Sequence, residues 1–223
     1  VDHSVTIASI GFATNLHALL ADADGASLVA RKVRRLVTMG GWYPQSPTPH
    51  AAAEWNFGGC GPTNVCIDFN NFTVPASCHY DSLGPLTFDL YSQLWPPSVP
   101  ITFLGGEVGE PVLTGGVLTD GAPASSPVRA AYIAYNGPHG NRSSWDPMTL
   151  LYAVRGNSAN WYQMHETGYN ELLPTGQNRW IDDGLDHNMG YLSLPSANID
   201  AAARTINNLL LDAHGGTHHA AAG

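Results

Sequence analysis

Three short apolar segments, each followed by glycine, constrain the fold of this chain more than any other feature. They are residues 5–10 (VTIASI, before Gly11), residues 35–39 (RLVTM, before Gly40) and residues 99–104 (VPITFL, before Gly105). Continuous apolar runs rich in β-branched residues are typical of buried strands in a parallel sheet. Between the first two segments, Leu16, Leu19 and Leu20 have helical spacing. The strand–helix–strand order predicts a βαβ unit, and therefore an α/β protein whose mostly parallel sheet is flanked by helices.

The glycines that end these segments also predict where a ligand binds. In open α/β sheets, ligands bind beyond the carboxyl ends of the strands. Gly11, the pair Gly40 and Gly41, and the pair Gly105 and Gly106 would then face one crevice. We expect the functional site at this edge of the sheet.

The remaining elements are read from local signals. Asp146 and Pro147 are typical of the first turn of a helix, and either Thr14 or Asn15 is placed to cap the helix after the first strand. The helix after Pro147 would bury Leu150, Leu151 and Val154, and a last helix from near Ser196 would bury Ile199, Ala202, Ile206, Leu209 and Leu210. Residues 157–194 alternate turns and short strands.

The sequence predicts one domain over residues 1–213. Residues 58–80 are rich in Gly, Pro, Asn and Cys, which predicts an inserted loop. Residues 214–223 have low complexity and predict a flexible tail. The chain begins directly with a turn and a strand, which favours loss or processing of sequence upstream.

Composition excludes several classes of protein. The 223 residues are 43% hydrophobic and 12% charged, so the chain is globular rather than disordered. Its net charge of −9 argues against binding to a nucleic-acid backbone, which needs clustered Lys and Arg. No apolar run approaches the roughly 20 residues that span a bilayer. We therefore expect neither a nucleic-acid partner nor a membrane.

The cysteines and two glycosylation sequons favour an extracellular, secreted glycoprotein. Cys60, Cys66 and Cys78 lie close together in the predicted insert, and sequons begin at Asn71 and Asn141. An odd number of cysteines allows one disulfide, either Cys60 with Cys66 or Cys60 with Cys78, and one free thiol. A zinc site is disfavoured because the chain has no CxxC pair and only three thiols.

Several motifs occur along the chain in a distinctive order. They are residues 5–16 (VTIASIGFATNL), residues 36–41 (LVTMGG), residues 53–57 (AEWNF) and residues 142–147 (RSSWDP). They resemble, in this order, the VTIVAxGPLTNxA, MGG, AEFN and HDP motifs of the inosine-uridine-preferring nucleoside hydrolases. Residues 105–109 (GGEVG), 114–115 (TG) and 144–147 (SWDP) resemble a fungal and bacterial branch that carries Trp where other members carry His. The resemblance covers nearly the whole chain apart from the insert and the tail.

This resemblance implies a set of site residues. Thr14 is similar to the threonine whose backbone carbonyl binds calcium in the family, and Asp146 to a carboxylate ligand of the same ion. Met39, Glu54 and Asn56 are similar to residues that line the ribose pocket. Glu107 matches a position near that pocket in the branch. Trp145 takes the place of the histidine that usually assists the departing base.

The implied reaction is the calcium-dependent hydrolysis of the N-glycosidic bond of ribonucleosides to free base and ribose. Its transition state resembles an oxocarbenium ion, and a carboxylate takes a proton from the attacking water. Trp145 cannot donate a useful proton, so it would stack on a purine or mark a change of substrate. Family members are usually dimers or tetramers, so a homo-oligomer is also implied.

One part of the family pattern is absent from the sequence. The family carries an N-terminal DxDxxxDD cluster, and the nearest match, Asp22 and Asp24, follows a helix rather than a strand. Calcium takes 6–8 oxygen ligands, so Asp146 and the Thr14 carbonyl are too few. Three explanations stay open: an incomplete sequence, a piece of a nicked protein that associates with its N-terminal fragment, or a catalytically inactive, lectin-like protein that binds sugars or nucleosides.

Overall fold

The centre of the molecule is a five-stranded sheet. A computed structural model describes residues 1–45, 53–58, 60–67, 73–78 and 83–212. The sheet order is β1-β2-β5-β11-β8, and the strands are β1 (Val5–Ser9), β2 (Val33–Met39), β5 (Ile101–Leu104), β11 (Met189–Ser193) and β8 (Gln163–His165). All neighbours pair in parallel except β8, which is antiparallel to β11. The prediction of a mostly parallel α/β sheet is confirmed.

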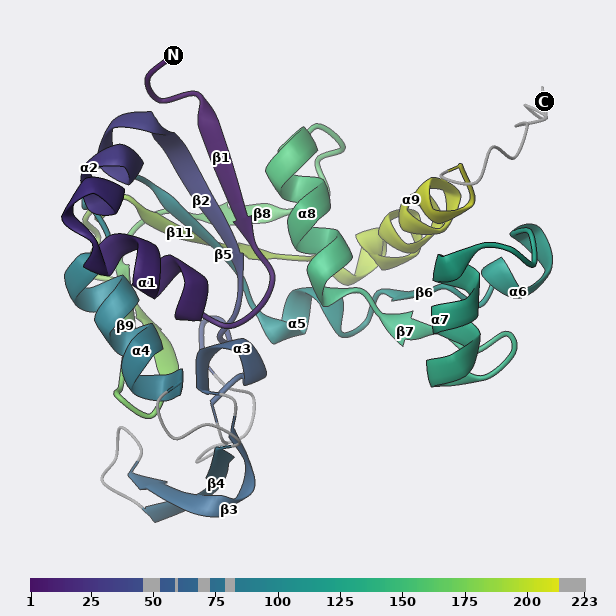
Figure 1. Cartoon of the computed structure of the whole chain (residues 1–223), viewed down its shortest axis with the longest axis horizontal. Helices are drawn as coiled ribbons and strands as arrows, with labels where there is room; N and C mark the ends of the chain where they lie inside the picture. Colours follow the sequence, from purple (N-terminus) through teal and green to yellow (C-terminus); the bar gives the residue numbers. More distant parts are fainter. Residues whose placement is uncertain (46–52, 59, 68–72, 79–82, 213–223) are drawn as a thin grey trace.

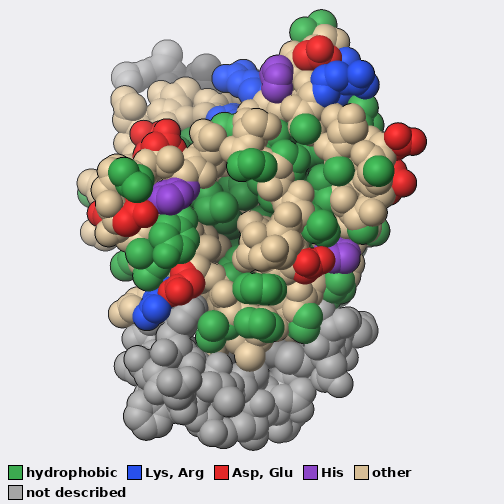
Figure 2. Space-filling model, turned by 90° about the vertical axis from the view of Figure 1, so that its left-hand side faces the viewer, with side chains coloured by type: hydrophobic (Ala, Val, Ile, Leu, Met, Phe, Trp, Pro, Cys, Tyr) green, Lys and Arg blue, Asp and Glu red, His purple; other side chains and the backbone are tan. Residues whose placement is uncertain are grey.

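Helices cover both faces of this sheet (Figure 1). On one side lie α1 (Thr14–Ala21), α2 (Ala23–Lys32) and α4 (Leu83–Asp89), which continues into a π-helical turn, η1 (Leu90–Leu94). On the other lie α8 (Trp145–Arg155) and α9 (Ile199–Asp212). Apolar side chains gather on the surface beyond α1, α2 and α4 (Figure 2), where Leu19 and Leu28 are exposed.

Strand alternation produces two separate cores. Successive side chains of a strand point to opposite faces, so Leu36 packs in the core under α1 and α2, whereas Val37 packs in the core under α8 and α9. In the same way, Phe103 packs in the core under α1 and α2, and Leu104 packs in the core under α8 and α9. Because both faces are covered, the central strands are continuous apolar runs, as the sequence shows.

The first strand differs from its prediction. We expected residues 5–10 to form a fully buried strand, but the side chains of β1 are exposed or half-buried. The reason is its position: within the described residues β1 pairs only with β2, so it forms an edge of the sheet.

Two details of the helices also differ. The N-cap of α1 is Ala13 without a side-chain capping bond, so neither Thr14 nor Asn15 caps it. On α8, Leu151 is buried as expected, but Leu150 and Val154 are 48% and 74% exposed. Met148, Thr149, Tyr152 and Ala153 form the rest of the buried face, because the helix is rotated relative to the predicted orientation. The last helix, α9, follows a 3₁₀ turn (Ser196–Asn198) and buries Ala202 and Ile206.

The predicted inserted loop contains regular structure. Strands β3 (Cys60–Ile67) and β4 (Thr73–Cys78) form an antiparallel pair whose backbone register sets Cys60 opposite Cys78. The description of residues 58–80 as a loop was therefore wrong in this respect. Asn71 and the predicted tail over 214–223 lie outside the described residues. Residues 157–194 do form turns and short strands, including β9 (Tyr169–Leu172) and β10 (Asn178–Ile181).

The short elements that complete the chain lie mostly toward one end of the sheet. They are α3 (Trp55–Gly58), α5 (Gly106–Gly109), β6 (Leu113–Thr114), α6 (Leu118–Gly121), α7 (Pro127–Asn136) and β7 (Arg142–Ser143). In Figure 1, α3 and α5 lie beneath the ends of the central strands, and α6, α7, β6 and β7 form a small lobe beside them. No helix among the described residues has the length and apolar character needed to cross a bilayer.

Candidate active site

The carboxyl ends of β2 and β5 meet, as the glycine pattern predicted. The Gly40 N–H donates to the Leu104 carbonyl at 3.0 Å, and the Gly106 N–H donates to the Gly41 carbonyl at 2.9 Å. Gly41 has a φ of +80°, which favours glycine. The chain therefore turns sharply at both strand ends and exposes backbone N–H groups to the side chains beyond them.

Met39, Glu54 and Asn56 are brought together at this edge. Glu54 is only 6% exposed, and its Oε2 accepts hydrogen bonds from the Gly41 N–H at 3.1 Å and the Asn56 N–H at 3.0 Å. The Asn56 amide donates to the Met39 carbonyl at 3.2 Å and lies 3.1 Å from the Met39 sulfur. Three residues that the resemblance assigned to a sugar pocket are thus neighbours.

Glu107 lies beside them on α5. Its Oε2 accepts a hydrogen bond from the Tyr43 N–H at 3.2 Å, and its Oε1 is buried without a hydrogen-bond partner. The carboxyl group folds over Gly105, where an added Cβ would lie 2.3 Å from Oε2. We call Met39, Glu54, Asn56 and Glu107 the strand-end cluster.

The carboxyl groups of this cluster have raised pKa values. Burial raises the pKa of Glu54 to about 7, against the opposing effect of its backbone hydrogen bonds, and the negative charge of Asp146 contributes. Burial likewise raises the pKa of Glu107 to about 7, with a contribution from the charge of Glu54. These groups therefore titrate near neutral pH and sense one another's charge.

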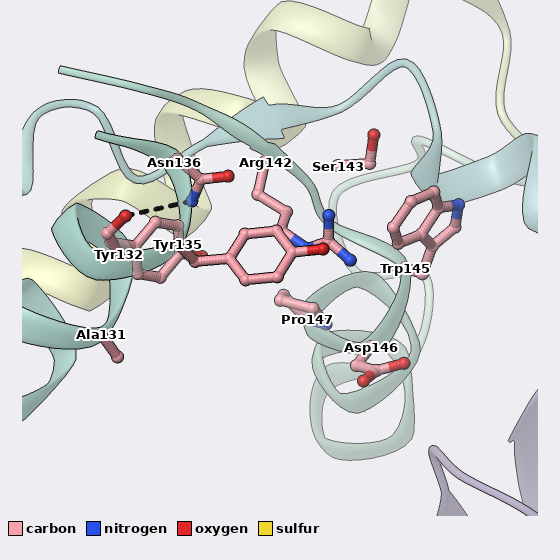
Figure 3. A pocket seen from close by; sticks show the side chains of 9 residues that line it. All are labelled: Ala131, Tyr132, Tyr135, Asn136, Arg142, Ser143, Trp145, Asp146 and Pro147. Carbon is pink, nitrogen blue, oxygen red and sulfur yellow. Dashed lines mark hydrogen bonds between the residues drawn. The ribbon is translucent and has the colours of Figure 1, made fainter. Parts of the chain in front are cut away.

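A second group of residues lines a pocket next to this cluster, and we call it the α7–α8 pocket. It has a volume of about 290 Å³. Its lining residues are Ala131, Tyr132, Tyr135, Asn136, Arg142, Ser143, Trp145, Asp146 and Pro147 (Figure 3). Two predicted site residues, Trp145 and Asp146, are among the lining residues, and Figure 3 shows the Asp146 carboxyl group directed away from Arg142 and Tyr135.

Asp146 lies in the first turn of α8 and is half-buried. Burial raises the pKa of its carboxyl group, and the positive charge of Arg142 opposes that rise. Its place in the first turn also sets it in the positive field of the helix N-terminus. Of the three acidic site residues, it is the one that lines the pocket.

Trp145 joins the pocket to the strand-end cluster. Its indole Nε1–H donates to the Gly106 carbonyl at 3.0 Å. Gly109 packs directly on the Trp145 backbone, where an added Cβ would lie 2.3 Å from the Trp145 Cα. The one polar hydrogen of the indole is therefore engaged by the backbone.

Thr14 lies at the exposed start of α1, after the loop that leaves β1. In that loop the Phe12 ring lies 6.3 Å from the Trp55 ring, which follows Glu54 directly. The β1 loop is thus close to the strand-end cluster. Within the described part of the chain, no hydrogen bond joins Thr14 itself to Asp146.

The described residues do not form a complete calcium site. Within them, no group of three or more His, Cys, Asp and Glu side chains is arranged to hold a metal ion. Asp146 supplies one carboxylate, whereas calcium takes 6–8 oxygen ligands. These residues alone do not match the charge and ligand number of the ion.

Four residues near the site were missed by our sequence analysis. The Asn178 side chain accepts from the Trp42 N–H at 2.9 Å and donates to the Trp42 carbonyl at 3.0 Å, which fixes the chain after Gly41. The buried Tyr43 hydroxyl has no hydrogen-bond partner. Tyr135 and Arg142 line the α7–α8 pocket. Only the spacing of Tyr132 and Tyr135 on a helix preceded by Ser126 and Pro127 gave a local signal.

The fold and this site define the class of the protein: it has the nucleoside-hydrolase fold. No family model matches the sequence, and no curated protein matches it. Among solved structures, a plant nucleoside hydrolase aligns with 94% of this chain at a TM-score of 0.58 and 16% identity. An inosine-uridine-preferring nucleoside hydrolase from Bacillus anthracis aligns with 93% at a TM-score of 0.55 and 15% identity.

A third solved structure has the same fold but a different description. It is the type III effector protein XopQ in complex with adenosine diphosphate ribose, which aligns with 95% of this chain at a TM-score of 0.54 and 15% identity. This chain spans 61% of the effector, 61% of the bacterial enzyme and 63% of the plant enzyme. The likeness therefore covers nearly all of this chain and less than two thirds of each neighbour.

Proposed function

We propose that this protein hydrolyses the N-glycosidic bond of ribonucleosides to give free base and ribose. The observation that carries the proposal is the grouping of three carboxyl groups beyond the strand ends. Burial is the main cause that raises the pKa of both Glu54 and Glu107; the charge of Asp146 adds to the rise at Glu54, and the charge of Glu54 adds to the rise at Glu107. Groups that titrate near the working pH are suited to proton transfer. The neighbours that share the fold and are named as nucleoside hydrolases support the same reaction.

In the proposed reaction, a water molecule attacks C1′ of the ribose. The oxygen of the water forms the new bond to C1′, and the electron pair of the C1′–N bond leaves with the base. Asp146 takes the proton released by the water, because it lines the pocket and is reached by solvent. The departing base takes up a proton from solvent.

The strand-end cluster would bind the sugar. Glu54 and Glu107 offer carboxyl oxygens to ribose hydroxyl groups, and Asn56 extends the same polar edge. Met39 supplies an apolar wall beside Asn56. Interactions with the sugar, remote from the bond that breaks, can be used to orient the substrate for reaction.

We propose that the reaction depends on calcium, and that some ligands of the ion come from outside the described residues. Asp146 and the Thr14 carbonyl would contribute, but the described side chains do not complete the coordination of the ion. An acidic N-terminal fragment, supplied as a separate chain or as further sequence, is the partner that we propose for this purpose. The base and ribose groups of the substrate remain the proposed small-molecule partners.

The test is base release from inosine, adenosine and uridine by this chain together with the proposed acidic N-terminal fragment, with calcium added or chelated and the free base separated by chromatography. We expect release by the wild type and a loss in Glu54→Gln. Glu166→Gln is the matched control, because Glu166 is exposed directly after β8 and its substitution removes a carboxylate in the same way. Equal release by the wild type and Glu54→Gln, or no release under any condition, would contradict the proposal.

A second candidate is a secreted sugar- or nucleoside-binding protein without turnover. The incomplete metal site favours it, and one neighbour with this fold is an effector protein in complex with adenosine diphosphate ribose. Calorimetric binding of ribose or adenosine diphosphate ribose, with no base released, would support this candidate. The exposed position of Asn141 is compatible with secretion and glycosylation, and mass spectrometry of material from a secreting host tests it.

A further inference from the structure

A second pocket lies at the opposite end of the sheet from the strand-end cluster. It is bordered by η1 and by Ile101 and Met189, which are the first residues of β5 and β11. The strand-end cluster lies beyond the carboxyl end of β5, so the two regions are separated by the length of the strands. The pocket has a volume of about 300 Å³, at the lower end of the range for small-molecule sites. We call it the η1 pocket.

Hydrogen bonds between separate segments fix the walls of the η1 pocket. The Trp95 indole N–H donates to the Val99 carbonyl at 2.8 Å, which closes the loop after η1. The Asn188 side chain donates to the Pro97 carbonyl at 2.9 Å, and the Asn188 carbonyl accepts from the Ile101 N–H at 2.9 Å. The cavity is therefore formed before a ligand binds, which lowers the entropic cost of binding.

Two irregular backbone segments meet at this pocket. The chain of α4 continues into the π-helical turn η1, and such turns occur frequently at functional sites. Asn188 has a φ of 56°, in the left-handed region that few residues other than glycine adopt. Both features favour a binding site over an incidental gap in the packing.

The inner part of the η1 pocket is apolar. Tyr91, Trp95 and Val99 line it and are buried, and Ile101 and Met189 add apolar surface from the two strands. A ligand that places a ring against these side chains removes apolar area from water.

The η1 pocket offers no free charge to a ligand. Among its described lining residues, none is Asp, Glu, Lys or Arg. His187 lines the pocket, but its Nε2 lies 2.8 Å from the Asp183 carboxylate and is therefore already paired. Burial of a charge without a partner is costly, so the pocket favours an uncharged ligand.

Ser92 and Gln93 supply the polar groups of the pocket. Both line it from η1, and both are exposed, so they lie at its mouth. Within the described part of the chain, neither side chain has a hydrogen-bond partner. The Gln93 carboxamide carries N–H donors beside a carbonyl acceptor, and a ligand with a second amide matches this pair in the reverse order.

We propose that the η1 pocket binds a small, uncharged aromatic amide. The ring of the ligand lies against the apolar side chains, and its amide group pairs with the Gln93 carboxamide at the mouth. This site is separate from the one in the proposed function, because none of the proposed catalytic or sugar-binding residues lines it.

Titration of the full chain with benzamide, benzoate and benzylamine at pH 8 tests the proposal. The three probes share one ring and differ in charge. Nuclear magnetic resonance follows the Trp95 indole N–H signal, which is identified by its absence in Trp95→Phe. We expect benzamide to shift this signal in a saturable manner, with a dissociation constant of about 0.1–1 mM. Benzoate and the benzylammonium ion should bind at least about tenfold more weakly.

Substitutions of Gln93 test the amide pairing. Gln93→Ala should weaken benzamide binding roughly fivefold, as expected for the loss of one hydrogen bond. Gln93→Glu keeps the size of the side chain and should shift the preference toward benzylammonium. Gln163→Ala is the matched control, because Gln163 is exposed on β8 and should leave binding unchanged.

Thermal unfolding confirms that each variant is folded. Three results would overturn the proposal: no saturable shift of the Trp95 signal with benzamide, equal binding of the charged probes, or unchanged benzamide affinity in Gln93→Ala. The assay contains no nucleoside, so its result does not depend on whether the protein hydrolyses one.

Discussion

The strand-end cluster and the α7–α8 pocket lie side by side but are built differently. In the cluster, Glu54 is nearly inaccessible and is held by backbone N–H groups of the strand ends. In the pocket, Arg142 is exposed and is held by ring faces. The buried carboxyl group of the strand-end cluster has a fixed orientation, which suits binding of hydroxyl groups in one geometry. The open α7–α8 pocket has fewer fixed polar contacts, which suits binding of ring systems that differ in their substituents. The comparison shows that the two regions differ in burial and in the groups that hold their charged side chains.

The largest expected effect is a loss of turnover on substitution of Asp146, which distinguishes the proposed proton acceptor from the residues of the strand-end cluster that are proposed to bind the sugar. Asp146→Asn removes the proposed proton acceptor and should lower kcat by about 100-fold or more, with a small change in KM. Steady-state kinetics with inosine measures both constants. Asp200→Asn is the matched control, because Asp200 also lies in the first turn of a helix. An equal loss in both variants would assign the effect to helix stability instead of proton transfer.

A second prediction concerns the stability of the strand-end cluster. The pKa of Glu54 is raised from 4.5 to about 7 by burial, so the folded state favours its neutral form. Its contribution to stability is complete below pH 4.5 and is lost as pH rises through about 7, with a magnitude of about 3 kcal/mol. Glu54→Gln should lack this dependence.

Urea unfolding of the wild type and Glu54→Gln at pH 5 and pH 8 measures it. The free energy of unfolding of the wild type should fall more between these two values than that of the variant. The Glu166→Gln variant should follow the wild type, since Glu166 is exposed. Parallel pH dependence in all three proteins would show that Glu54 titrates in its ordinary range.

A third prediction tests whether the two regions act together. Gly109→Ala would set a methyl group against the Trp145 backbone, because the nearest atoms lie at 2.3–2.5 Å. Displacement of the start of α8 should lower the free energy of unfolding by about 1–3 kcal/mol and weaken both ribose and base binding. Gly11→Ala is the control, because a Cβ added at Gly11 meets no atom within 4 Å. Gly137→Ala would be a poor control, because Gly137 has a positive φ that strains any other residue. Loss of binding to only one of the two ligands would show that the regions are independent.

The smallest expected effect comes from loss of the hydrogen bond between the Trp145 indole and the Gly106 carbonyl, which connects the α7–α8 pocket to the strand-end cluster. Trp145→Phe keeps an aromatic face but removes the 3.0 Å hydrogen bond to the Gly106 carbonyl. We expect a loss of about 1 kcal/mol in stability and a severalfold decrease in turnover, whereas Trp145→Ala should decrease turnover further. Chemical denaturation and initial rates measure the two effects. Turnover equal to that of the wild type in Trp145→Ala would remove Trp145 from the proposed mechanism.

The two regions also differ in how far the sequence predicts them. The family resemblance assigned Met39, Glu54 and Asn56 to one pocket, and the glycine-ended strands predicted only the edge of the sheet at which such a pocket would lie. Arg142 stands in the motif at residues 142–147, but neither this motif nor any periodicity predicted its contact with Tyr135 of α7. Their contact depends on how a small lobe packs beside α8, and such tertiary placement is not encoded in the periodicity of either segment.

The same limit explains the errors in secondary structure. The apolar pattern of residues 5–10 is that of a central strand, but strand order decides which strand becomes an edge, and spacing along the chain does not reveal it. The exposed Leu150 and Val154 show a similar effect on α8, since of the three predicted core residues only Leu151 is buried. In residues 58–80, Gly and Pro predicted a loop, yet pairing between distant halves formed β3 and β4.

The position of β1 has a consequence for handling and assembly of the protein. Within the described residues, one side of this strand has no neighbour in the sheet, and such an edge is a template for pairing with another chain. Val5 is exposed at the start of this strand and Ile10 directly after it. Self-association through a continuous intermolecular sheet would then grow with concentration, and sedimentation of a Val5→Lys variant beside the wild type would show how much of it depends on this edge.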